Sequence, residues 1–213
     1  MSLFVDFKDG VSNEELDMAE KTISNGGVIA FPVDNMYVLG VSVFNEDGIM
    51  KLFDIKNRPH SKPLSVLVSD LGMIKSLASN ISEDEKKIID EFFPGPLTLV
   101  LDKKEEIPDI ISEGNNTVGV RMPTSKLALN LLKGVKTPLV VSSANLYEEE
   151  SPRDIESVKN SFGNLVDCYI DAGELSGDSE STVVRIEEGN INIIREGAIK
   201  EEEIDKIIME GKE

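Results

Sequence analysis

The sequence predicts an α/β fold in which strands and helices alternate along a single domain. Short apolar runs such as GVIAF and LTLVL are typical of buried strands, and the segments between them carry helix-capping signals. The 213 residues suit one domain, and 40% apolar residues are enough for a sizeable core. Because the two kinds of element interleave, we expect residues 1–213 to form one unit with a mixed sheet.

The first helix and the first buried strand are predicted from signals near the N-terminus. Ser12, with Glu15 three residues later, forms a capping box, which is a signature of a helix start. Gly26 and Gly27 end that helix, because glycine is common just beyond a helix C-terminus. The strand GVIAF follows, breaks into the polar turn PVDN, and continues as the apolar segment MYVLG.

Two further helices are predicted in the next part of the chain. Asn45 is a suitable N-cap for a helix that carries Ile49, Leu52 and Phe53. Ser82 and Glu85 form a second capping box, and the helix that follows has an apolar face of Ile88, Ile89, Phe92 and Phe93. The strand PLSVLV, residues 63–68, lies between the two helices, and the sequence PGP ends the second.

The second half of the chain continues the alternation. We expect a helix near residues 125–132 and a terminal helix at about residues 201–210. The predicted strands are LTLVL (97–101), TVGVR (117–121), PLVV (138–141), DCYIDAG (167–173), STVVRI (181–186) and NINIIR (190–195). The last two are predicted to form a hairpin through EEG (187–189), and residues 148–153 to form a polar loop.

Charge restricts the function classes. The net charge is −18, from 22 basic and 40 acidic residues. Because binding to phosphates needs clustered Lys and Arg, this charge argues against a broad nucleic-acid-binding surface, although it permits a local basic pocket.

The sequence also restricts the compartment and the metal chemistry. The N-terminal residues MSLFVDFKDG do not resemble a signal peptide, and we expect no membrane span. A single cysteine, Cys168, cannot form an internal disulfide, and a reduced cytoplasmic setting fits it. With one His and one Cys, a zinc site of the His/Cys type is excluded.

Several apolar strands end in short polar or basic insertions. These are PVDN, KNRP, RMP, SSAN, Ser181-Thr182 and REG. The chain has only five arginines, and three of them lie in these insertions: Arg58, Arg121 and Arg195. Arg binds phosphate or carboxylate in a bidentate manner, which predicts an anion pocket at the strand ends. The alternative is that each Arg pairs with an acidic residue at the surface.

The segment SSAN supplies two hydroxyls and an amide that can bind phosphate or ribose oxygens, or it is an ordinary turn. The usual nucleotide fingerprints, the Walker loop and GxGxxG, are absent from the sequence. A serine-hydrolase interpretation also fails, because there is no GxSxG elbow and His60 is the only histidine.

Seven motifs together resemble the YrdC-like family, the threonylcarbamoyl-AMP synthases. They are GGVIAFPVDNMYVLG, KNRPHSKPLSVLV, FFPGPLTLVL, TVGVRMP, PLVVSSAN, STVVRI and IIREGAI, in family order over about residues 12–200. The resemblance implies the short, single-domain form, with a twisted mixed sheet, flanking helices and a concave binding surface. Longer members of the family carry a further C-terminal domain.

The resemblance also implies a reaction, that of a nucleotidyltransferase. L-Threonine and bicarbonate give a carbamate, which attacks the α-phosphate of ATP to form threonylcarbamoyl-adenylate and pyrophosphate. Mg²⁺ is expected on the triphosphate and not on side chains. Partner proteins then use the product for the threonylcarbamoyladenosine modification of tRNA, and the family has also been linked with double-stranded RNA.

The family's site residues carry over by motif. The ATP-binding positions are Lys56, Arg58, Lys62, Thr117, Ser143, Asn145, Ser151 and Arg195. The threonine-binding positions are Asn35, Leu67, Arg121, Val141 and Ser181, with Arg121 as the expected clamp for the carboxylate. No residue resembles a dedicated general base.

The sequence departs from the family pattern mainly on the amino-acid side. The family turn usually reads Pro-Thr-Asp/Glu-Thr-x-Tyr-Gly-Leu, and here Val33, Asn35 and Val38 replace the two threonines and the glycine. Lys62 replaces a common asparagine, and Leu67 replaces a common histidine. Three hypotheses follow: an active synthase with a rearranged threonine pocket, a nucleotide-binding paralogue with a different or lost second substrate, or an RNA-binding module related to translation.

Overall fold

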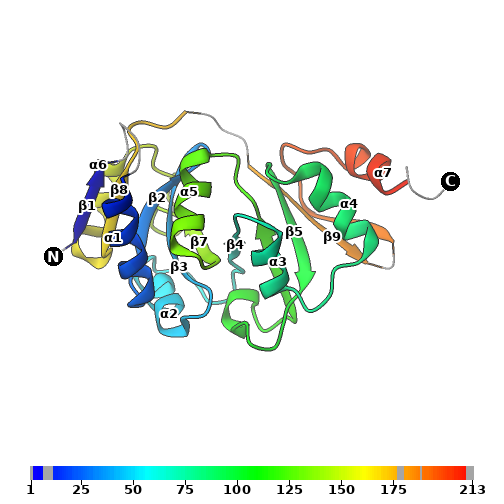
Figure 1. Cartoon of the computed structure of the whole chain (residues 1–213), viewed down its shortest axis with the longest axis horizontal. Coiled ribbons are helices and arrows are strands. Elements are labelled where there is room, and N and C mark those ends of the chain that lie inside the picture. Colours follow the sequence, from blue (N-terminus) through cyan, green and yellow to red (C-terminus); the bar gives the residue numbers. More distant parts are fainter. Residues whose placement is uncertain (1, 7–11, 177–179, 188, 210–213) are drawn as a thin grey trace.

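The computed structural model describes residues 2–6, 12–176, 180–187 and 189–209. The strands of these residues form one mixed, ten-stranded sheet in the order β1-β8-β2-β3-β7-β4-β6-β5-β9-β10, and helices flank it (Figure 1). The predicted α/β fold with a mixed sheet and flanking helices is therefore confirmed. None of the helices described is long and apolar enough to cross a membrane.

The bounds of the elements are as follows. The strands are β1 (Leu3–Asp6), β2 (Ile29–Val33), β3 (Met36–Ser42), β4 (Ser65–Leu67), β5 (Leu97–Asp102), β6 (Thr117–Arg121), β7 (Leu139–Ser143), β8 (Cys168–Asp171), β9 (Thr182–Glu187) and β10 (Asn190–Arg195). The helices are α1 (Asn13–Ser24), α2 (Glu46–Ile55), α3 (Leu71–Leu77), α4 (Glu83–Phe92), α5 (Lys126–Val135), α6 (Ile155–Phe162) and α7 (Glu201–Met209), with short 3₁₀ helices η1 (Asp109–Ser112) and η2 (Gly163–Leu165).

The helix starts follow the capping signals of the sequence. Both predicted capping boxes are present: Ser12 caps α1 and Ser82 caps α4, each with the reciprocal bond from the Glu three residues later. Asn45 accepts a hydrogen bond from the Gly48 N–H at the start of α2, as predicted. Local side-chain to backbone bonds of this kind form within one turn, which is why the sequence predicts them well.

Several boundaries differ from the sequence-based prediction. Ser142 and Ser143 belong to β7, because they pair with β3, so the turn begins after them and not at Ser142. The strand predicted for residues 63–68 is only three residues long. The sequence signals did not predict β1, α3 or α6, which are among the shorter elements. Residues 188 and 210, from the predicted hairpin turn and terminal helix, lie outside the described residues.

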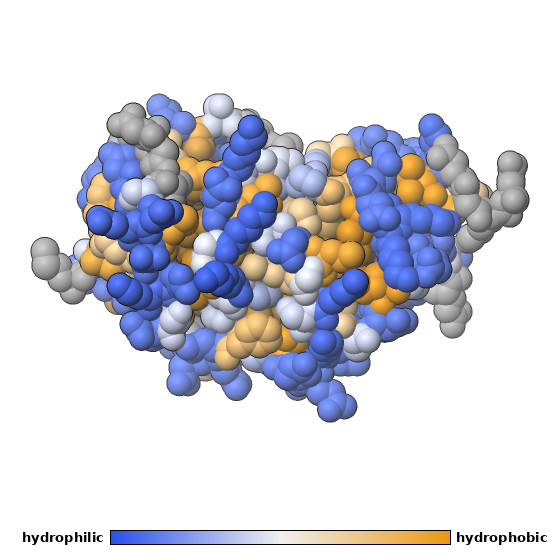
Figure 2. Space-filling view, in the orientation of Figure 1, coloured by the Kyte–Doolittle hydropathy of each residue, from blue (hydrophilic) through white to orange (hydrophobic). Residues whose placement is uncertain are grey.

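Helices cover the two faces of the sheet unequally. On one face, α1 and α5 pack over β8, β2, β3 and β7. On the other face, α2, α3, α4, α6 and α7 pack against a larger core that runs from β8 to β9. On the first face, no α-helix of the described residues packs over β6, β5, β9 and β10. Figure 2 shows hydrophilic side chains over much of the visible surface, with hydrophobic patches between them.

The capping box of α4 gives a stability prediction. Ser82→Ala removes the acceptor for the Glu85 N–H, so we expect the free energy of unfolding in urea to fall by about 1 kcal/mol. Ser61→Ala, at an exposed position outside the helices, is the control and should leave the free energy of unfolding unchanged. Equal losses in the two variants would contradict the capping role.

Candidate functional site

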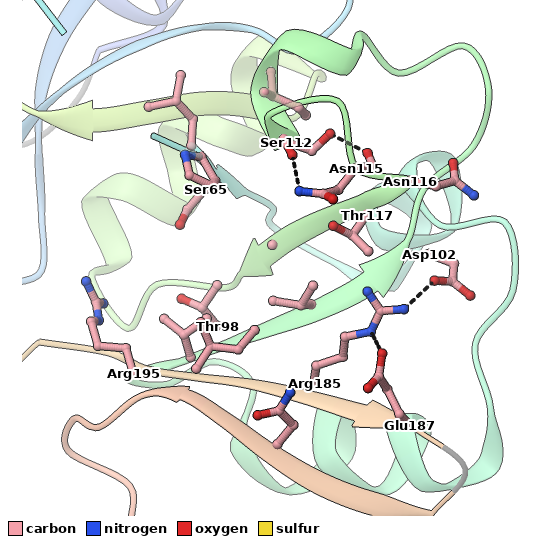
Figure 3. A pocket seen from close by; sticks show the side chains of 18 residues that line it. Ser65, Thr98, Asp102, Ser112, Asn115, Asn116, Thr117, Arg185, Glu187 and Arg195 are labelled. Atoms are coloured by element: carbon pink, nitrogen blue, oxygen red, sulfur yellow. Dashed lines mark hydrogen bonds and ion pairs between the residues drawn. The ribbon is translucent and has the colours of Figure 1, made fainter. Parts of the chain in front are cut away.

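Two adjoining cavities lie on the uncovered part of the sheet. We call the one of about 590 Å³ the outer cavity and the one of about 260 Å³ the inner cavity. They share part of their lining, namely Pro63, Leu64, Ser65, Thr98 and Arg195, so they are two ends of one cleft. Figure 3 shows the outer cavity, with Arg195 and Ser65 at one end and Arg185, Asp102 and Glu187 at the other.

The alternation of side chains along each strand decides which residues face this cleft. In β5, Thr98, Val100 and Asp102 line the outer cavity, while the residues between them belong to the core on the other face. In β6, Thr117 and Gly119 line it in the same way. Because successive side chains point to opposite faces, one set of strands provides both a packed core and a binding surface.

A β-bulge in β10 directs Arg195 into the cleft. The register passes from Ile193 opposite Val184 to Arg195 opposite Val183, so Ile194 is the extra residue. In a regular ladder Arg195 would lie opposite Thr182, on the face packed against the core. The bulge therefore places the guanidinium on the open face, and bulges are common next to functional sites.

Hydroxyl groups connect Arg195 to the strand beside it. The guanidinium of Arg195 donates to the carbonyl oxygen of Ser181 at 2.8 Å and to its Oγ at 3.0 Å. That Oγ also lies 3.0 Å from the Oγ1 of Thr98. Ser181 and Thr98 thus join β5 to Arg195 at the point where the two cavities meet.

Arg58 and Arg121 bring two incompletely bonded guanidinium groups to the inner cavity. Among the described residues, their buried Nε atoms have no hydrogen-bond partner. Burial lowers the pKa of both side chains from the ordinary value. Since an unpaired buried donor costs roughly 1–3 kcal/mol, two such donors in one cavity indicate a place for anionic oxygens.

Asp34 is the partner of Arg121 and was not among the predicted site residues. Its Oδ2 accepts a hydrogen bond from Nη2 of Arg121 at 2.5 Å. Its Oδ1 accepts from the backbone and hydroxyl of Thr124 and from the N–H of Ser125, where α5 begins. The PVDN turn therefore ties the end of β2 to the end of β6 and to α5.

Lys56 lies behind the end of β7 and not in the lining of either cavity. Its ammonium donates to the carbonyl oxygens of Ser143 and Asn145, the second at 2.6 Å. Burial, followed by the positive charge of Arg58, lowers the pKa of Lys56 to about 7. Lys56 thus holds the turn that carries Ser143, whose side chain does reach the inner cavity.

The structure brings most of the predicted site residues together. The predicted residues that line the inner cavity are Arg58, Leu67, Arg121, Val141, Ser143, Ser151, Ser181 and Arg195, and Thr117 lines the outer cavity. Four predicted residues line neither: Lys56, Lys62, Asn35 and Asn145. Lys62 is exposed, Asn35 is half-buried in the turn after β2, and Asn145 is buried with its Nδ2 donating to the carbonyl oxygens of Leu146 and Glu149.

Apolar side chains form one wall of the inner cavity. Val33, Met36, Val38, Leu67 and Val141 all contribute to it. Three of these, Val33, Val38 and Leu67, are positions at which the sequence departs from the family pattern. These three departures therefore lie on one wall of the cavity that Arg121 also lines, whereas Asn35 and Lys62 line neither cavity.

The titratable groups of the cleft suit binding better than proton transfer. The carboxylates in the lining are Asp102, Glu187 and Glu180, and each pairs with an arginine: the first two with Arg185 and the third with Arg195. No His, Cys or Lys lines either cavity in the part of the chain that the structure describes. The arrangement can hold anions and exclude water, and it resembles no acid–base pair.

Comparisons with known proteins identify the same family as the motifs. The Sua5/yciO/yrdC family model, described as "Telomere recombination", matches residues 21–197. A threonylcarbamoyl-AMP synthase of Pyrococcus abyssi is 33% identical over 99% of this chain and 62% of its own, and one of Bacillus subtilis is 31% identical over 96% of this chain and 60% of its own. The crystal structure of P. abyssi Sua5 complexed with L-threonine superposes with a TM-score of 0.90 at 33% identity, over 97% of this chain and 61% of that one. The chain thus spans about three fifths of the length of these relatives.

Gly119 gives a test of the outer cavity. It leaves the open face of β6 without a side chain, and an added Cβ would lie 3.3 Å from Cγ2 of Thr98. A glycine within a strand often marks the close approach of a ligand. Gly119→Leu should therefore weaken the binding of ATP, the nucleotide implied by the resemblance, at least about tenfold in calorimetry.

The matched control introduces the same side chain elsewhere on the sheet. Asn190→Leu lies on the exposed edge strand β10, outside both cavities, and should bind ATP as the wild type does. Wild-type affinity in Gly119→Leu would show that the nucleotide does not use this face.

Proposed function

The chain belongs to the Sua5/yciO/yrdC family, and from this premise we propose that it is a threonylcarbamoyl-AMP synthase. In this proposal L-threonine, bicarbonate and ATP give threonylcarbamoyl-adenylate and pyrophosphate. Residues 1–213 act as one domain of an enzyme of the nucleotidyltransferase class, in the cytoplasm.

One observation carries the proposal. Three of the five arginines line the inner cavity, and two of them have a buried Nε without a partner among the described residues. The reaction brings together a carboxylate and a triphosphate, so it needs cationic groups of this kind at two places in one cleft. The crystal structure of the P. abyssi relative in complex with L-threonine supports L-threonine as the ligand that supplies this carboxylate.

The roles of the residues follow from their places in the cleft. Arg121, at the apolar wall, takes the threonine carboxylate, and Arg58 and Arg195 face the phosphates. The outer cavity, with about 590 Å³ and Thr117 in its lining, has the size of a ligand site and takes the nucleoside. The hydroxyls of Ser143, Ser151 and Ser181 supply neutral hydrogen bonds between the two ends.

The chemistry needs orientation more than covalent help. The threonine amine and bicarbonate form the carbamate with loss of water. A carbamate oxygen, already anionic, then bonds to the α-phosphorus while the bond to pyrophosphate breaks, so no general base is required. The arginines hold the reacting anions in line and offset the charge that builds on the phosphates.

Mg²⁺ is proposed to enter on the triphosphate. No group of three or more His, Cys, Asp or Glu side chains suited to a metal ion occurs in the described residues. When bound to ATP, Mg²⁺ offsets phosphate charge. The product is proposed to pass to partner proteins that modify tRNA. Contact with tRNA or double-stranded RNA is a secondary candidate that the charge of −18 disfavours.

Pyrophosphate release tests the function directly. Purified protein with ATP, Mg²⁺, bicarbonate and L-threonine should release pyrophosphate only when threonine is present. Release that ignores threonine would support the alternative, a nucleotide-binding paralogue whose apolar wall selects another second substrate. If no amino acid supports the release of pyrophosphate, the proposal that the protein is an enzyme of this class is contradicted.

Two arginine variants separate the ends of the cleft in the same assay. Arg58→Ala should raise the KM for ATP about tenfold or more with little effect on threonine, and Arg121→Ala should do the reverse. Small, equal effects would show that neither side chain binds the substrate assigned to it.

The low pKa of Lys56 predicts a pH dependence. In the free chain this pKa is about 7, and the charge of Arg58 is one of the causes. Lys56 lies outside the cavity lining, but a triphosphate that binds Arg58 should offset that charge and raise the pKa of Lys56. ATP affinity should therefore fall as pH rises above 7, by up to about tenfold per pH unit, until the pKa of the complex is reached. Calorimetry between pH 7.5 and pH 9, where the γ-phosphate of ATP is ionised, measures this slope. Lys56→Met should flatten this dependence of ATP affinity on pH. Equal slopes in the wild type and the variant would show that ATP binding is not linked to the protonation of Lys56.

A further inference from the structure

We propose that Asp34 is a positioning residue that holds the Arg121 guanidinium in the orientation in which it receives a ligand carboxylate. The inference rests on the proposed function for the identity of that ligand, L-threonine. The contact itself does not depend on the ligand.

The ion pair between Asp34 and Arg121 is short and well buried. Nη2 and Oδ2 are 2.5 Å apart, and the two side chains are only 15% and 14% exposed. A charge-assisted hydrogen bond in such a place is strong and directional, so it fixes the plane of the guanidinium.

The position of Asp34 is fixed from two sides. Its backbone has a φ of +51°, in the left-handed region that Asp and Asn adopt more readily than most residues, within the turn that joins Val33 to Met36. Its Oδ1 accepts three hydrogen bonds from Thr124 and Ser125 at the entry to α5. The carboxylate is therefore a rigid support and not a mobile surface group.

Asp34 uses only part of the guanidinium. It accepts from Nη2, while the buried Nε of Arg121 has no partner among the described residues. Arg121 lines the inner cavity beside Val33, Val38 and Leu67. A carboxylate that enters along this apolar wall meets donors that Asp34 has oriented and left available.

Asp34 also sets the charge at this end of the cleft. Burial and the nearby Arg195 both lower the pKa of Arg121, whereas Asp34 raises it. With Asp34 present, the ion pair has no net charge, and Arg195 is paired with Glu180. Without Asp34, Arg121 would add one uncompensated positive charge at this end of the cleft.

Asp34→Asn tests the proposal, because it keeps the side-chain shape and an acceptor for Thr124 and Ser125 but sets an amide against Arg121. The KM for threonine should rise about tenfold to a hundredfold, the range expected for losing one charge-assisted hydrogen bond. The KM for ATP and the kcat at saturating threonine should remain close to wild type. Asp34→Glu, which keeps the charge, should recover part of the loss. If Asp34→Asn does not fold, Asp34→Glu should still show a smaller and selective rise.

Thr124→Val is the matched control. It removes one hydrogen bond to the same Asp34 carboxylate and leaves the ion pair intact. It should lower the melting temperature and leave the KM for threonine unchanged. If Thr124→Val raises the KM for threonine as much as Asp34→Asn does, Asp34 is merely structural and the proposal is overturned. An unchanged KM in Asp34→Asn, or equal rises for threonine and ATP, also overturns it.

A second measurement needs no substrate. The chain has five arginines, so the Nε–H signals in a ¹⁵N NMR spectrum are few, and Arg121→Lys identifies the one of interest. We expect that signal to shift or broaden in Asp34→Asn and to persist in Thr124→Val, and an unchanged signal overturns the proposal. Since this result does not use threonine, it separates failure of the positioning role from failure of the proposed reaction.

Discussion

The unequal covering of the sheet is the constraint on which the rest of the structure depends. Of the α-helices that the structure describes, five pack against one face and two, α1 and α5, pack against the other. Because side chains alternate along a strand, β5, β6 and β9 bury one set of residues and expose the other. The open set, which no described α-helix covers, forms part of the cleft, and the 3₁₀ helix η1 borders it at Ile111 and Ser112. A helix placed over these strands would fill it with apolar side chains.

The cleft contains four of the five arginines of a strongly acidic chain. The acidic residues nearest its arginines, Asp34, Asp102, Glu180 and Glu187, form ion pairs with them. These pairs limit the repulsion between the arginines. The buried pair of Asp34 and Arg121 also fixes the guanidinium, at the cost of removing two charges from water. Buried donors that have no partner among the described residues favour a ligand with anionic oxygens, and this preference fits the proposed adenylate chemistry.

The polar turn after β2 contains both a residue that the family motif indicates and a residue whose contacts are distant in the sequence. The sequence drew attention to Asn35, because of its position in the family motif, and to the valines on either side. In the structure the neighbouring Asp34 makes the bonds to Arg121, Thr124 and Ser125. Val33 and Val38 instead form the apolar wall beside that ion pair. The signal that could have indicated Asp34 is its charge at the tip of a buried turn, where an unpaired carboxylate would be costly.

The sequence by itself determined most of the longer elements, three of the helix caps, the family and the scarcity of arginine. The elements and the caps depend on residues within one turn of helix or a few strand positions of one another, and the family depends on the order of seven short motifs. Only the tertiary structure decided which polar groups meet. Asp34 and Arg121 lie 87 residues apart. Asp34 is in the turn between β2 and β3, and β7 and β4 separate β3 from β6, the strand that ends at Arg121. Lys56 likewise finds its carbonyl acceptors 87 and 89 residues away. Such contacts follow from strand order and register, which result from packing the whole core at once and which local signals do not encode.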